Sequence, residues 1–91
     1  MYSKKYRIEK VEQFGSNNPI YENAEGCVCY PAYLKVGERG WLLYEVQLED
    51  EWRAYPHRLH TSIIQNVKYW RDGSIVITTE HTRLTLKEVI D

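Results

Sequence analysis

The stretch TSIIQNVKYWRDGSIVITTEHTRLTLKEV, residues 61–89, decides the fold of this chain. Apolar and polar residues alternate through it in three short runs, which is the pattern of half-buried β-strands. An Asp72-Gly73 pair joins the first run to the second and favours a tight hairpin turn, because Gly accepts positive φ. The runs are Ile63–Trp70, Ser74–Thr79 and Arg83–Val89. The stretch therefore predicts a three-stranded antiparallel meander.

Three earlier segments predict further strands. Lys5–Phe14 alternates loosely, and Trp41–Leu48 is eight residues without Gly or Pro, with Leu42, Tyr44, Val46 and Leu48 expected to face the core. Ala24–Tyr33 is ambiguous, because Pro31 has no N–H to donate and confines this piece to a sheet edge or a strand end.

The remaining segments are expected to be turns or irregular. Gly15–Pro19 is rich in turn residues, and one short helical turn fits between Ser16 and Glu25. Two glycines mark a turn in Leu34–Gly40. Trp52–His60 is expected to be irregular because Pro56 interrupts it.

Together these elements predict one domain over residues 1–91, since the chain has no room for a second core. The expected fold is all-β: a small five- to six-stranded antiparallel barrel, SH3-like or related, which removes exposed strand edges. A two-sheet roll is the alternative. A chain this short buries a modest fraction of its surface, so we also expect a homo-oligomer.

Charge and hydropathy limit the classes of partner and the compartment that we expect. Lys and Arg number 12 against 13 Asp and Glu, so nucleic acid is an unfavourable partner because it needs a basic excess. No apolar run reaches the length of a membrane span and no leader pattern opens the chain, which favours a cytoplasmic protein without a membrane partner. Cys27 and Cys29 are two residues apart on one extended stretch, where strand geometry disfavours a mutual disulfide, and reduced thiols fit the same compartment.

The aromatic residues are unusual in type. Eight Tyr and three Trp accompany a single Phe, Phe14. Buried Tyr hydroxyls need partners, so this excess favours an interface, where one end of the ring is apolar and the other wet. The preference of Tyr for half-exposed sheet faces explains it equally well.

The up-and-down path of the meander brings two polar segments to one end of the domain. The residues entering the first strand, His60–Ser62, should lie beside the connection Thr79–Arg83, and the basic segment Arg53–Arg58 leads into the same end. The candidate ligand-binding residues are Trp52, Arg58, His60, Thr61, Ser62, Thr79, His81, Thr82 and Arg83.

These residue types suit an anionic, hydroxyl-rich ligand. Arginine offers forked donors to phosphate or carboxylate, histidine donates or accepts according to pH, and an aromatic ring can stack on a base. A nucleotide-like molecule is the natural candidate. The alternative is an ordinary polar loop in which Thr and Ser hydroxyls satisfy backbone groups.

Metal binding and catalysis are less favoured. Cys27-x-Cys29 and His57-x-x-His60 supply zinc-type ligands, but paired cysteines at structural zinc sites have two to four residues between them, and here only one residue intervenes. Ser62, His60 or His81, and Glu80 contain the residue types of a hydrolytic triad without a nucleophile elbow or an oxyanion loop. We therefore predict no metal, no cofactor and no enzymatic activity.

The C-terminal part of the chain resembles small phage and mobile-element proteins of Firmicutes. The resemblance covers roughly the last 40% of the chain and rests on a tryptophan, HRLHTS at residues 57–62, the Asp-Gly hairpin and ITTEHTRLTL at residues 77–86. Compact phage proteins of this size are often anti-defence factors, which inhibit a host defence protein by contact or sequester a cyclic nucleotide or cyclic ADP-ribose signal.

The sequence thus leads to two functional hypotheses. The first is a non-enzymatic, phage-encoded anti-defence factor that sequesters an anionic nucleotide-like ligand in the host cytoplasm. The alternative is a protein–protein interaction module that inhibits a host defence protein through a Tyr- and Trp-rich surface.

Overall fold

The computed structural model describes residues 4–15, 17–48 and 51–89, with side chains described throughout except at residue 20 and in the segments 44–48 and 51–58. The described chain forms strands and one short helix. In order these are β1 (Tyr6–Gln13), α1 (Pro19–Ala24), β2 (Val28–Tyr33), β3 (Arg39–Leu48), β4 (Glu51–Tyr69), β5 (Ile75–Thr79) and β6 (Thr82–Glu88).

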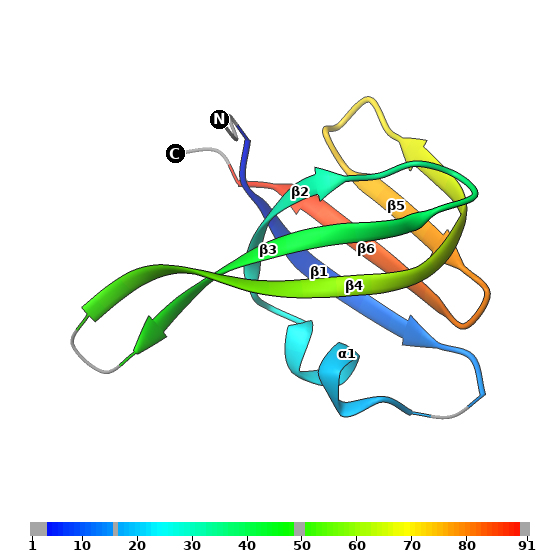
Figure 1. Ribbon diagram of the computed structural model, residues 1–91. Helices are drawn as coiled ribbons and strands as arrows, with labels where there is room; N and C mark the ends of the chain where they lie inside the picture. The colour runs from blue at the N-terminus through cyan, green and yellow to red at the C-terminus, as the bar shows by residue number, and fades with distance from the viewer. Residues whose placement is uncertain (1–3, 16, 49–50, 90–91) are drawn as a thin grey trace.

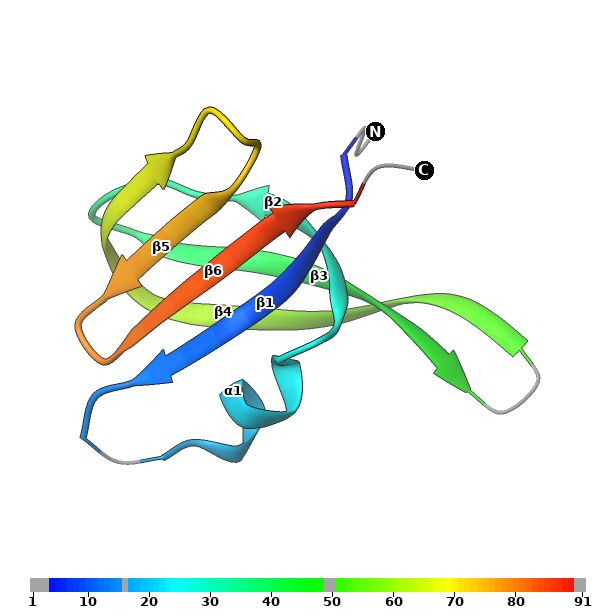
Figure 2. The same ribbon diagram turned by 180° about the vertical axis from the view of Figure 1, so that it is seen from behind.

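The strands form one closed antiparallel sheet (Figure 1). Each strand pairs with the next along the chain, and β6 returns to pair with β1, for example Ile8 with Leu86. The prediction of a small all-β barrel is confirmed. Figure 2 shows β1, β5 and β6 side by side on the face turned away from the viewer of Figure 1.

The C-terminal meander forms as predicted, from the second half of β4, β5 and β6. Its first turn is closed by Trp70 N–H donating to Ser74 O at 2.9 Å and by the Asp72 carboxylate accepting Ser74 N–H at 2.9 Å. Gly73 occupies the turn with φ of 90°, where a side chain would be strained. Burial alternates along the strands, with Ile75, Ile77, Thr79, Thr82, Leu84 and Leu86 facing inward.

The expectation of an irregular segment at Trp52–His60 was wrong, because β4 is one continuous strand. Tyr44 pairs with His57 and Val46 with Arg53, so Ala54–Pro56 lie opposite a single residue of β3. This bulge is where a strand accommodates a residue without an N–H. The sheet therefore absorbs Pro56 without ending.

The β3–β4 hairpin extends beyond the body of the barrel (Figures 1 and 2). Of the four residues of Trp41–Leu48 expected to face the core, Leu42 is buried, and the side chains of Tyr44, Val46 and Leu48 lie outside the described set. The register pairs Trp52 with Gln47 near the far end of the hairpin.

Helix α1 covers one open end of the barrel. The predicted helical turn is confirmed, and Asn18 begins it by accepting N–H groups of Tyr21 and Glu22 on its backbone oxygen at 3.0 and 3.2 Å. Pro19 follows, at the position where its missing N–H costs nothing. Tyr21 and Ala24 stand three residues apart on one helix face and are both part of the buried core.

The contact between β1 and β2 is the narrowest in the barrel. It consists of two residue pairs, Tyr6 with Cys29 and Arg7 with Val28. Pro31 lies beyond this contact and pairs only toward β3, opposite Leu42. The expectation that Pro31 confines this segment to a sheet edge or a strand end was wrong for the segment, because β2 pairs with both β1 and β3. Pro31 is accommodated in the part of β2 that pairs with β3 alone.

In the described residues, no helix is both long and apolar enough to cross a membrane.

Candidate ligand-binding site

The predicted convergence of two polar segments holds at the level of the backbone. Ile64 of β4 pairs with Thr79 of β5, so His60–Ser62 and the β5–β6 turn both lie just beyond this pair, at the end of the barrel that α1 covers. Their side chains, however, divide between the protein interior, the outer surface and a pocket.

Three of the predicted ligand-binding residues are buried within the protein. Thr61 and Thr79 are each 1% exposed and Thr82 is 2% exposed. Thr61 Oγ1 accepts the N–H of buried Gly40 at 2.8 Å and donates to Ser62 O at 2.7 Å. The Thr79 hydroxyl lies 2.8 Å from that of Thr82 and accepts the Thr82 N–H at 3.0 Å. These hydroxyls satisfy backbone groups, as the polar-loop alternative expected.

Two more predicted residues lie on the outer surface. Arg83 extends over β1, where its guanidinium lies 3.6 Å from the Glu12 carboxylate and 5.6 Å from the centre of the Phe14 ring. His81 lies 3.8 Å from the carboxylate of Glu80, and both side chains are well exposed. Exposed pairs of this kind contribute little stability, and neither residue is among those that line the His60 pocket described below.

Two further predicted residues, Trp52 and Arg58, are placed only by their backbone, since their side chains lie outside the described set. Trp52 stands eight positions before His60 on the same strand, which at about 3.3 Å per residue separates them by roughly 25 Å. The hairpin thus carries Trp52 away from the predicted site. Arg58 pairs with Leu43, two positions from His60.

His60 and Ser62 do line a pocket, together with residues that sequence reasoning missed. This pocket has a volume of about 370 Å³ and lies between α1 and the adjoining parts of β3 and β4. Such a volume falls at the lower end of the range for small-molecule sites. Its lining residues are Asn18, Tyr21, Arg39, Leu59, His60, Thr61 and Ser62.

The Arg39 guanidinium gives this pocket its charge. Arg39 is the first residue of β3 and pairs with Ile63, which places it beside the entry to the meander. Among the described residues it has neither a hydrogen bond nor an ion pair through its side chain, and no carboxylate lines the pocket. The pocket therefore carries an exposed cation with its donors available.

Neighbouring groups hold the walls of the pocket in place. Asn18 is fixed by Gln13, whose Oε1 accepts the Asn18 N–H at 2.7 Å and whose Nε2 donates to Asn18 O at 3.3 Å. The His60 and Trp41 rings are in contact, with centroids 4.2 Å apart and planes tilted by 44°. Tyr21 Oη donates to His60 O at 3.5 Å, a long bond that links the helix to β4.

The described side chains do not form a metal centre. No three of the histidine, cysteine, aspartate and glutamate side chains in this set gather closely enough to hold an ion. Cys29 is fully buried, and its burial, with a smaller contribution from Cys27, raises the pKa of its thiol to about 12. A thiol protonated at neutral pH is a poor ligand and a poor nucleophile.

The other described groups with a resolved pKa change are not among the residues that line the pocket. In the β2–β3 turn, hydrogen bonds from Tyr33 Oη at 2.8 Å and from Lys35 lower the pKa of the exposed Glu38 carboxyl. Hydrogen bonds from Ser74 lower the pKa of Asp72. Both carboxylates stabilise tight turns.

Comparison of the chain with protein-family models, with curated proteins and with solved structures found no match.

Proposed function

We propose that this protein is a non-enzymatic binding protein that captures a small anionic, nucleotide-like ligand in the pocket between α1, β3 and β4. The observation that carries the proposal is the Arg39 cation, which has no partner among the described residues and faces a pocket lined by hydroxyl, amide and imidazole groups. Phosphate oxygens match the forked donors of a guanidinium.

The ring pair beside the pocket supports a ligand with a flat base. The exposed His60 lines the pocket with Arg39, and its ring contacts that of the partly exposed Trp41. Aromatic faces stack on any nucleobase, with a contribution of about 1–3 kcal/mol per base. A ligand that combines phosphate with a base would use both features at once.

The non-enzymatic part of this proposal rests on the hydrogen bonds and positions of the Thr and Ser hydroxyls. The hydroxyls of Thr61, Thr79 and Thr82 are buried and hydrogen-bonded within the chain. Ser62 lines the pocket with His60, but among the described residues its hydroxyl has no hydrogen bond to a histidine, and Glu80 lies beside His81 on the outer surface. A binding protein needs only the cation, the stacking surface and a shaped wall. In a phage setting it would act as an anti-defence factor in the host cytoplasm, by sequestering a cyclic nucleotide or cyclic ADP-ribose signal.

Calorimetry with a panel of cyclic di- and trinucleotides and cyclic ADP-ribose isomers tests the proposal. We expect heat for at least one member, and mass spectrometry should recover that ligand unchanged. Arg39→Ala should weaken binding by roughly 10- to 150-fold, because it removes charge-assisted hydrogen bonds of about 1.5–3 kcal/mol. The matched control is Arg83→Ala, since Arg83 lies outside the pocket and pairs with Glu12.

Folded protein that gives no heat with any panel member would overturn the proposal. Equal losses in Arg39→Ala and Arg83→Ala would also contradict it, because they would indicate binding at the outer surface of β6. Conversion of the ligand would remove the non-enzymatic part of the proposal.

The second candidate function is a protein–protein interaction module that inhibits a host defence protein. It is favoured by the exposure of Tyr69 and Trp70, which are 66% and 51% exposed. Exposed Tyr and Trp are the residues that most often dominate binding at interfaces. This candidate predicts that Trp70→Ala abolishes binding to a protein partner, while the nucleotide panel gives no heat.

A further inference from the structure

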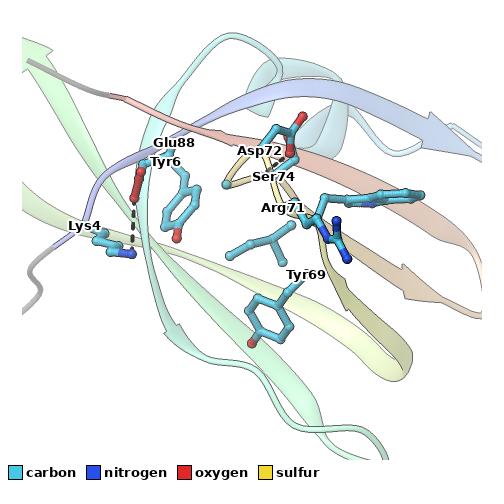
Figure 3. A pocket seen from close by; sticks show the side chains of 10 residues that line it. Lys4, Tyr6, Tyr69, Arg71, Asp72, Ser74 and Glu88 are labelled. Atoms are coloured by element: carbon cyan, nitrogen blue, oxygen red, sulfur yellow. Dashed lines mark hydrogen bonds and ion pairs between the residues drawn. The ribbon is translucent and has the colours of Figure 1, made fainter.

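A second pocket lies at the other end of the barrel, beside the β4–β5 turn (Figure 3). It is open and has a volume of about 370 Å³. We call it the notch. It lies between the β4–β5 turn, the start of β1 and the end of β6, and its lining residues are Lys4, Tyr6, Tyr69, Trp70, Arg71, Asp72, Gly73, Ser74, Ile75 and Glu88.

The rim of the notch exposes two large aromatic side chains next to an arginine. Tyr69 and Trp70 are more exposed than any other described Tyr, Trp or Phe, and Arg71 follows them directly. Lys68 lies with its ammonium 4.2 Å from the centre of the Trp70 ring, so the ring has a neighbour on one face. Tyr, Trp and Arg are the three residue types most enriched at the energetic centres of protein interfaces.

The notch also carries charges of both signs. The Lys4 ammonium lies 3.4 Å from the Glu88 carboxylate, and in Figure 3 this pair borders the notch on the side opposite Arg71 and Asp72. Arg71 has no ion pair among the described residues. Two cations thus accompany two carboxylates within one small surface. A partner of uniform charge would meet like charge there. A two-fold axis, in contrast, can set the Lys4–Glu88 side of one copy against the Arg71–Asp72 side of the other, which brings opposite charges together.

The scaffold of the notch is rigid enough to bind without large rearrangement. The turn is closed by the Trp70–Ser74 hydrogen bond, and Asp72 accepts the Ser74 N–H. A Cβ built on Gly73 would lie 3.5 Å from the Glu88 side chain, so the turn packs directly on β6. A surface already in its binding shape loses less conformational entropy on association.

We propose that the notch is a self-complementary surface through which two copies of this chain form a two-fold symmetric dimer. In a two-fold contact the same patch serves both partners, so Arg71 of one protomer meets Glu88 of the partner subunit twice, and the aromatic rims cover each other. This inference is independent of the proposed ligand pocket, which lies at the opposite end of the barrel.

Sedimentation velocity of the full chain over a range of protein concentrations tests the proposal through charge reversal. The wild type should approach twice its 10.9 kDa mass as concentration rises. Arg71→Glu alone should remain a monomer, because it places two carboxylates together at each contact. Lys4→Glu combined with Glu88→Lys should also remain a monomer, although it keeps the ion pair within the protomer in reversed polarity.

Mixing the two monomeric variants is the decisive measurement. At one contact of the mixed dimer, the carboxylate introduced at position 71 faces the ammonium introduced at position 88. At the other contact, the unchanged Arg71 faces the unchanged Glu88. Both contacts are attractive again, so a species of twice the mass should return.

The mixing also controls for folding, since misfolded variants would not restore each other. Lys10→Glu, an exposed charge reversal farther along β1, is the matched control and should dimerise like the wild type.

Three results would overturn the proposal. A wild-type monomer at every concentration would exclude self-association, and the notch would then serve a different protein. A dimer that persists in both charge-reversal variants would place the contact elsewhere on the chain. Monomers that stay separate on mixing would contradict the pairing of Arg71 with Glu88. None of these outcomes depends on nucleotide binding, so this proposal and the proposed function fail separately.

Discussion

Replacing Thr79 by valine should destabilise this barrel more than any comparable change at its surface. Valine keeps the shape of threonine and removes only the hydroxyl. That hydroxyl accepts the Thr82 N–H at 3.0 Å and the His81 N–H at 3.3 Å, and it shares a 2.8 Å hydrogen bond with the Thr82 hydroxyl. Because Thr82 is only 2% exposed, water cannot replace the lost partner.

The magnitude follows from the groups left without a partner. A buried donor or acceptor that loses its hydrogen bond costs about 1–3 kcal/mol. Thr79→Val leaves both the N–H and the hydroxyl of Thr82 unsatisfied, so we expect a loss of about 2–4 kcal/mol in the free energy of unfolding. Thr82→Val should cost only about 1 kcal/mol, because the Thr79 hydroxyl still bonds the Thr82 backbone at 3.0 and 3.3 Å.

Urea unfolding followed by tryptophan fluorescence measures these differences. The double variant should cost less than the sum of the single variants by about 1 kcal/mol, since it no longer contains an orphaned Thr82 hydroxyl. Thr79→Ser is the matched control, which keeps the hydroxyl and loses about 0.8 kcal/mol with its methyl group. If Thr79→Val were no worse than Thr79→Ser, or if the cycle were strictly additive, the assigned network would be refuted.

Three further predictions concern other parts of the fold. Gly40→Ala should destabilise the fold by about 1–3 kcal/mol through overpacking, because the new Cβ would lie 3.1 Å from the backbone oxygen of Tyr33. Differential scanning calorimetry should show a lower melting temperature, and an unchanged transition would contradict the close packing. Iodoacetamide at mildly alkaline pH should modify Cys27 and spare Cys29, whose pKa is about 12, until the protein unfolds; peptide mass mapping distinguishes the two thiols, and early labelling of Cys29 would contradict its burial. The pKa of Asp72 is lowered in the folded state, so its stabilisation of the turn is present above its ordinary pKa of 3.8 and disappears as pH falls through the pKa of the folded state. NMR titration of the carboxyl should show the lowered pKa, and an unshifted midpoint would contradict the turn hydrogen bond.

The alternation of residues predicted the meander because its physical basis is local. Strand side chains point alternately to two faces, so Ile75 and Ile77 mark the inward face without any knowledge of the partners. The same parity also assigns Thr79 to the inward face, and Thr82 with it beside Leu84. Their bonds to backbone groups match the polar-loop alternative of the sequence analysis, whereas the ligand hypothesis assigned the same hydroxyls to a binding site.

The site itself was only half predictable. The hairpin path predicted that His60 lies at the end of the barrel where the candidate pocket is found, since antiparallel connections determine which strand ends meet. Arg39 was missed because Gly40 was interpreted as a turn residue, whereas the close approach of Ile64 and Tyr33 requires a glycine within the strand. No local pattern distinguishes these two uses of glycine. Likewise, a proline usually ends a strand, and only the pairing of β4 with β3 shows that a bulge accommodates Pro56.

The pairing of β1 with β6 has a consequence for how the chain folds. Tyr6 pairs with Glu88, so the barrel closes through contacts between its two most distant strands. During synthesis β1 emerges first and its principal partner emerges last, while β4, β5 and β6 join through short turns that form early. High contact order of this kind slows folding, and until closure both outer strands present unpaired edges. We expect closure of β1 onto β6 to be the rate-limiting step, and a nascent chain stalled before β6 to be the species most prone to aggregate.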